Sequence, residues 1–110
     1  MKKKAFVLAV LLLAARAFAA PDFRSDPAAF QTEAYIRVMQ ADQALDEGDE
    51  ATARAYYSEG LDLFRELAAS YPGWEPRIVR YRAAYCDNRI AEINQRVGER
   101  AAFTSAQTAA

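Results

Sequence analysis

Few residues in this chain could do chemistry, and the histidine count is the first reason. The sequence contains no histidine, which removes the commonest general base and metal ligand. The single cysteine, Cys86, therefore lacks the partner that usually activates a nucleophilic thiol. Cys86 lies in a row of apolar residues along one side of a predicted helix, which we call a seam. This position favours a buried thiol that packs like a small hydrophobic side chain. A redox-active or intermolecular cysteine is the alternative.

Carboxylates gather in one stretch, at Asp42, Asp46, Glu47, Asp49 and Glu50. Calcium-binding loops space their ligands as D-x-[DN]-x-[DN]-G-x₅-E, and this stretch does not follow that pattern. We therefore interpret it as a solvated helix end, in which Asp49 and Glu50 suit the positive N-terminus of the next helix. Nothing fixes two carboxylates across a cleft, so the sequence predicts no metal, no cofactor and no enzymatic activity.

Aromatic and arginine residues around the third predicted helix are more informative. Tyr and Arg are enriched at binding hot spots because they combine apolar area with directed polar contacts. Five arginines lie between Arg77 and Arg96, which would suit an acidic partner segment. In the alternative interpretation the aromatic residues cap the core and the arginines pair with Glu92 or Asp87. The candidate partner-binding residues are Trp74, Ile78, Tyr81, Arg82, Tyr85, Arg89 and Arg96.

Three helices must position these residues, because apolar residues recur at spacings of three or four in three segments. The predicted seams are Phe30, Ala34, Val38, Ala41 and Leu45, then Ala53, Tyr57, Gly60, Phe64, Leu67 and Tyr71, and finally Val79, Ala83, Cys86, Ile90, Ile93 and Val97. Capping and helix-breaking residues separate the segments. These are Asp26-Pro27, Gly48, Asp49, Pro72-Gly73, Pro76 and Gly98. Strand alternation is found nowhere.

The connections between the three segments are short, and short loops force neighbouring helices to be antiparallel. The sequence therefore predicts an all-α domain of three antiparallel amphipathic helices over residues 27–98. Residues 20–26 are expected to be an extended leader. Residues 99–110 are rich in Ala, Thr, Ser and Gln, with Phe103 as the only large apolar residue. Such a segment buries too little to offset its ordering entropy, so it is predicted to be a disordered tail.

The N-terminus has the layout of a secretory signal peptide, with a basic start at residues 2–4, an apolar run over residues 5–15 and small residues before Pro21. We place the cleavage after Ala19. The run is too short to span a membrane, so the mature chain is expected to have no span. Removal of residues 1–19 leaves 10 arginines against 15 acidic residues, a net charge of −5. This balance argues against nucleic-acid binding. The protein is predicted to be exported from a bacterial cell, to the periplasm or the exterior.

Residues 36–61 resemble a tetratricopeptide repeat. Small residues stand where the two helices of such a repeat cross, a turn follows seven residues after the first of them, and a large aromatic lies between the helices. The matching residues are Ala41, Gly48-Asp49, Ala53, Tyr57, Gly60 and Leu61. The resemblance implies a module that binds a protein segment in a groove lined by the first helices of successive repeats.

The chain also departs from the pattern of that family. Arg37 stands where the family prefers Trp, and Gln40 where Leu is usual. The proline that the family places near Arg65 comes seven residues later, at Pro72, so the second helix is about two turns longer than usual. By the same resemblance, the third helix would be the first half of a second repeat.

We therefore expect an exported protein–protein interaction module, an adaptor or scaffold of one and a half repeats. The alternative is a structural homo-oligomer in which a second chain completes the half repeat. A third class is a thiol redox or small-ligand protein that uses Cys86.

Overall fold

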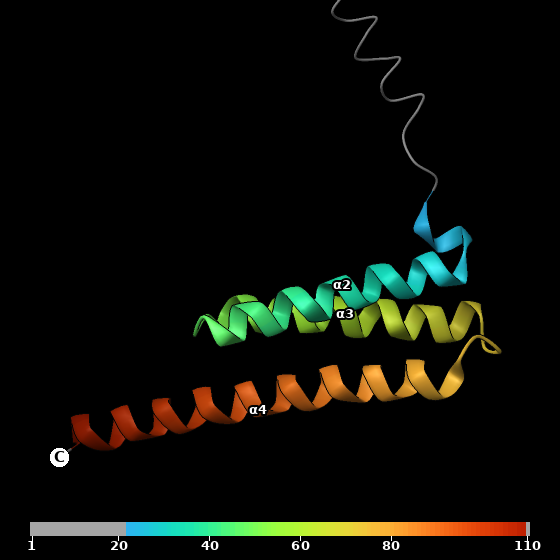
Figure 1. Cartoon of the computed structure of the whole chain (residues 1–110). Helices are drawn as coiled ribbons and strands as arrows, with labels where there is room; N and C mark the ends of the chain where they lie inside the picture. Colours follow the sequence, from blue (N-terminus) through green and yellow to red (C-terminus); the bar gives the residue numbers. More distant parts are fainter. Residues whose placement is uncertain (1–21, 110) are drawn as a thin grey trace, which may run out of the picture.

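The computed structural model describes residues 22–109, and the predicted signal peptide, residues 1–19, lies outside the described residues. The described residues contain a short 3₁₀ helix and three α-helices, and no strand. Their bounds are η1 (Phe23–Ser25), α2 (Pro27–Asp46), α3 (Glu50–Ser70) and α4 (Pro76–Ala109). Successive α-helices run antiparallel, and α3 packs against both α2 and α4 (Figure 1). The prediction of an all-α fold with three antiparallel helices is thus confirmed.

Side-chain caps begin two of the helices where the sequence predicted. The Asp26 carboxylate accepts a hydrogen bond from the Ala29 amide at 3.0 Å, and Pro27 is the first helical residue. The Asp49 carboxylate accepts from the Thr52 amide at 3.1 Å. Between α2 and α3, Gly48 takes a left-handed conformation with φ of 80°, which a residue without a Cβ adopts at little cost.

The predicted seams form one hydrophobic core. Its largest fully buried side chains are Tyr57, Phe30, Phe64, Leu67, Ile93 and Cys86. The helices α2 and α3 approach closely at Gly60, where a Cβ would lie only 3.3 Å from Val38 Cγ2. At the far end of the third seam, Val97 is 39% exposed.

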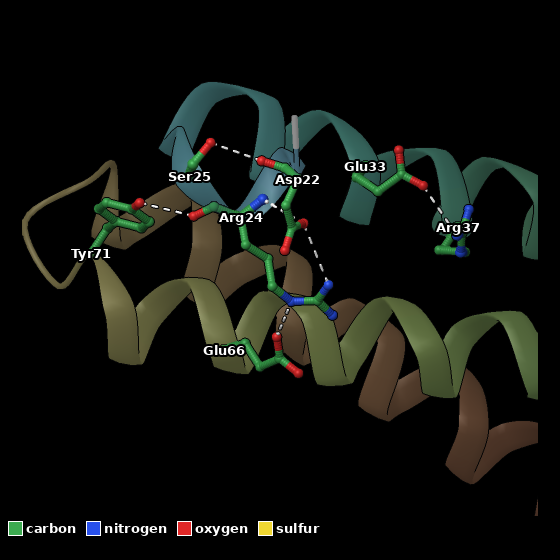
Figure 2. A network of polar contacts seen from close by, with 7 residues as sticks. All are labelled: Asp22, Arg24, Ser25, Glu33, Arg37, Glu66 and Tyr71. Carbon is green, nitrogen blue, oxygen red and sulfur yellow. Dashed lines mark hydrogen bonds and ion pairs between the residues drawn. The ribbon is translucent and has the colours of Figure 1, made fainter. Parts of the chain in front are cut away.

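The segment before α2 is not an extended leader, as far as residues 22–26 are concerned. It forms η1 because Asp22 accepts two hydrogen bonds from the residues that follow it. The Asp22 carboxylate accepts a hydrogen bond from the Arg24 amide, and the Asp22 carbonyl accepts one from the Ser25 hydroxyl at 2.8 Å (Figure 2). Tertiary contacts then hold the turn against α3. Arg24 Nε donates to Glu66 at 2.9 Å, and the Tyr71 hydroxyl donates to the Arg24 carbonyl at 2.9 Å.

The third helix does not end at Gly98, and residues 99–109 are helical rather than disordered. Gly98 is not among the glycines with positive φ, and nothing lies within 4 Å of where its Cβ would be. A glycine in a helix costs only about 1 kcal/mol relative to alanine, and the alanines that follow have the highest helix propensity. The Thr104 and Thr108 hydroxyls also donate to carbonyls one turn earlier. We call residues 99–109 the α4 overhang, since α4 has 34 residues against 21 in α3.

Candidate functional site

A hydrogen-bonded cluster joins all three helices at the centre of the bundle. The Asp42 carboxylate of α2 accepts from the Tyr57 hydroxyl of α3, which is fully buried. It also accepts from the Tyr85 hydroxyl of α4 at 2.8 Å. Arg89 Nε donates to the same Tyr85 oxygen at 3.2 Å, and its Nη1 lies 3.1 Å from the Glu92 carboxylate. The cluster therefore fixes the distance between α2 and α4, two helices that otherwise pack mainly on α3.

The electrostatics of this cluster follow from burial and from the Asp42 carboxylate. Burial raises the pKa of Tyr57, and the hydrogen bond to Asp42 raises it further. The pKa of Arg89 is also raised, chiefly by its bond to the Tyr85 hydroxyl. Both groups keep their protons at any ordinary pH. Tyr57 and Arg89 therefore act in the cluster as hydrogen-bond donors.

A shallow hollow of about 250 Å³ lies beside the cluster, between α2 and α4. We call it the α2–α4 groove. The Arg82 guanidinium lies across the Tyr35 ring, with Cζ 4.1 Å from the ring centroid, a cation–π distance. Arg82 forms no ion pair with any residue in the range 22–109. The lining residues are Tyr35, Val38, Asp42, Tyr81, Arg82 and Tyr85.

Large apolar side chains are exposed around this groove. Tyr81 is 72% exposed, the most of any large hydrophobic residue described. Met39 lies one turn after Tyr35 on α2, and Ile78 one turn before Arg82 on α4, and both are also exposed. Apolar area therefore flanks a cation on both walls of the groove.

The structure divides the seven predicted partner-binding residues into two groups. Tyr81 and Arg82 line the groove, and Ile78 is exposed one helical turn before Arg82. The other four are engaged within the chain, as the alternative interpretation expected for some of them. Besides Tyr85 and Arg89 in the central cluster, Trp74 donates to the Gln31 side chain at 3.0 Å, and Arg96 lies 3.0 Å from Glu50.

Sequence reasoning missed the contribution of α2 to this site. Tyr35, Met39 and Asp42 are spaced by four and three residues, so they form a row on one flank of the first seam. The same rule that selected the α4 residues could have selected this row. In the sequence, however, Asp42 also belongs to the acidic stretch of residues 42–50, which hides this row.

That acidic stretch is only partly a solvated helix end. Asp46, Glu47 and Asp49 are exposed, as expected. Asp42, by contrast, is half-buried in the central cluster. Glu50 bridges Arg96 and Arg100 of α4, and hydrogen bonds from these two arginines hold the pKa of its carboxyl below the usual range. Within the described part of the chain, no three His, Cys, Asp or Glu side chains are grouped so that they could hold a metal ion.

Cys86 is fully buried on the α4 seam, which confirms the interpretation of its thiol as a packed side chain. Burial, together with the nearby Asp42 carboxylate, raises the thiol pKa to about 11. The thiolate, which is the reactive form, is therefore scarce at neutral pH.

None of the helices described over residues 22–109 combines the length and apolar character needed to cross a membrane. Comparison of the chain with protein-family models, curated proteins and solved structures found no match in any of the three.

Proposed function

We propose that the chain is an exported adaptor, a protein-interaction module that binds a segment of another protein in the α2–α4 groove. The observation that carries this proposal is the exposed apolar rim around Arg82, formed by side chains of two helices whose spacing the central cluster fixes. A preorganised surface binds with less loss of conformational entropy than a flexible one. The resemblance to a tetratricopeptide repeat supports the same surface, because it places the binding groove between the first helices of successive repeats.

The side chains of the groove define the chemistry of the segment. Tyr81, Met39 and Ile78 offer apolar contact, and Arg82 offers a charge that no carboxylate in the described range neutralises. The partner segment would therefore carry a carboxylate between apolar side chains. Binding is favoured over catalysis because the Asp42 carboxylate and the Tyr85 hydroxyl in the groove are already hydrogen-bonded to each other.

Photo-crosslinking tests the proposal. Met39 is exposed on α2, one turn after the groove residue Tyr35 and next in sequence to the groove residue Val38. A photoreactive amino acid at Met39, in the mature chain expressed in its host, should capture a distinct protein. The same group at Ala69, an exposed position on α3 that does not line the groove, should not capture it. Capture at both positions, or at neither, would contradict the groove as the binding surface.

The affinity of the captured partner then tests the individual residues. Tyr81→Ala and Arg82→Glu should each weaken binding by at least about tenfold, the cost of losing an interface anchor. Arg77→Glu is the matched control for Arg82→Glu, because it makes the same charge change at an exposed α4 position outside the groove. Tyr85 and Arg89 are poor choices for this test, since their replacement would also disturb the central cluster.

A further inference from the structure

A second hollow lies on α3 and α4, distinct from the α2–α4 groove. It has a volume of about 320 Å³ and is near the loop that joins the two helices. We call it the outer pocket. Arg65, Ala68 and Tyr71 contribute from the α3 side, and Arg80 and Ala83 from α4. On α4 these positions lie on the flank opposite to Arg82 and Tyr85, the residues that contact α2, because each residue turns the helix by about 100°.

The outer pocket combines an apolar interior with two cations. Phe64, Trp74 and Val79 also line it, so its walls are largely aromatic and aliphatic. Neither Arg65 nor Arg80 forms an ion pair with a residue between 22 and 109. Its size is at the low end of the range of about 300–1,000 Å³ for ligand sites, which suits one aromatic side chain better than a long segment. The complementary group is thus an aromatic ring with a carboxylate close by.

The α4 overhang presents that combination. Phe103 is 65% exposed, and Glu99 lies one turn before it on the same side of the helix. Glu99 accepts a hydrogen bond from Gln95 but forms no ion pair with a described residue. Both Arg96 and Arg100, its basic neighbours, are paired with Glu50. The carboxylate of Glu99 therefore remains available to an outside cation.

A chain cannot fill its own outer pocket with its own overhang. Phe103 lies 20 residues beyond Ala83 on one continuous helix, which corresponds to about 30 Å. Any such contact must therefore be made between two molecules. We propose that the chain self-associates, with Phe103 of one copy inserted into the outer pocket of a second copy and Glu99 paired with Arg80 or Arg65. One inserted ring buries far less than the roughly 800 Å² per partner of a standard interface, so the association should be weak and concentration-dependent.

Sedimentation velocity of the mature chain, residues 20–110, over a range of concentrations tests this proposal. The wild type should show a concentration-dependent shift from monomer to a larger species. Phe103→Ala should weaken the association by roughly 10- to 100-fold, as expected for loss of one buried aromatic side chain, while alanine preserves the helix. A wild type that stays monomeric at every concentration, or a Phe103→Ala variant that associates normally, would overturn the proposal.

Charge exchange tests the orientation of the two copies. Arg80→Glu with Arg65→Glu in one chain should weaken association, and so should Glu99→Arg alone. A mixture of the Arg65→Glu/Arg80→Glu chain with the Glu99→Arg chain should associate better than either variant alone, because in a mixed pair each overhang meets a pocket of opposite charge. No gain on mixing would assign any self-association to a different surface.

The two proposals can fail separately. Tyr81→Ala changes the α2–α4 groove and should leave self-association unchanged, whereas Phe103→Ala should leave binding of a captured partner unchanged. A loss of self-association in Tyr81→Ala would place the second copy in the α2–α4 groove and would overturn the assignment to the outer pocket.

Discussion

Replacement of Gly60 by alanine or leucine measures how closely α2 and α3 approach. A Cβ at this position would lie 3.3 Å from Val38 Cγ2, 3.5 Å from the Ala34 carbonyl oxygen and 3.5 Å from Arg37 Cβ. The Val38 methyl can move by a few tenths of an ångström, but the Ala34 carbonyl belongs to the backbone of α2. Gly60→Ala also gains about 0.8–1.0 kcal/mol of helix propensity. The two effects oppose each other, so we expect a net change within about 1 kcal/mol of zero.

The leucine variant has no such compensation. Its further carbon atoms have no space between the helices, so overpacking should destabilise the fold by about 1–3 kcal/mol or more. For a domain of this size, each kcal/mol lowers the melting temperature by about 4–8 °C. Thermal and urea unfolding, followed by far-UV circular dichroism, would measure both variants. A Gly60→Leu protein as stable as the wild type would refute the close crossing of α2 and α3.

Gly98 supplies the matched control. Nothing lies within 4 Å of where its Cβ would be, and its backbone is helical, so the same two substitutions meet no steric obstacle there. Gly98→Ala and Gly98→Leu should each increase the helical signal, and neither should lower the free energy of unfolding. A loss of helicity in Gly98→Ala would instead mean that α4 ends at this residue.

Three further perturbations address the polar contacts and the thiol. Tyr57→Phe removes one of the two hydroxyl groups that donate to Asp42 without leaving a cavity. Its free energy of unfolding, measured in urea, should fall by about 1.5–3 kcal/mol, as for other hydrogen bonds to charged groups. A loss below about 0.5 kcal/mol would argue against this bond. The ion pairs of Glu50 lower the pKa of its carboxyl in the folded state. They therefore stabilise the fold fully above the ordinary carboxyl pKa of about 4.3. This stabilisation is lost as the pH falls through the lower pKa of the folded state. The melting temperatures of wild type and Glu50→Gln should therefore differ at neutral pH and converge in acid, and a difference that is constant with pH would contradict this. Cys86, with a thiol pKa raised to about 11, should react with a thiol reagent at pH 8 on the order of 100-fold more slowly in the native fold than in urea, and rapid labelling would favour a redox role.

The parts of the fold that depend on local chemistry could be predicted from the sequence. The caps at Asp26 and Asp49 and the left-handed turn at Gly48 each require only neighbouring residues, and each is present. The end of α4 could not be predicted in this way. At Gly98 a cost of about 1 kcal/mol competes with the summed propensity of several alanines, and a rule that reads glycine as a terminator ignores that sum.

The candidate site was harder to predict, because the role of each flanking residue depends on the distance between helices. Tyr85 and Tyr81 are four residues apart on α4, and this spacing alone does not say which of them contacts α2. Tyr85 reaches a carboxylate 43 residues earlier in the chain, whereas Tyr81 has no such neighbour and stays exposed. Only the spacing between α2 and α4 decides which of the two is structural and which is available to a partner.

The extra length of α3 links the fold to both proposals. On the pattern that the resemblance implies, the second helix would end near Arg65, but α3 continues to Ser70. Beyond that position, Glu66 and Tyr71 hold η1. Ala68 and Tyr71 also line the outer pocket, beside Phe64 and Arg65, which lie within the usual length of the helix. Because α3 is longer, α4 also starts later in the chain, at Pro76, than the next helix would in a standard repeat. A shortened α3 would therefore truncate the outer pocket while leaving Asp42, and with it the α2–α4 groove, in place. The feature that departs most from the tetratricopeptide pattern is thus the one on which the proposed self-association depends.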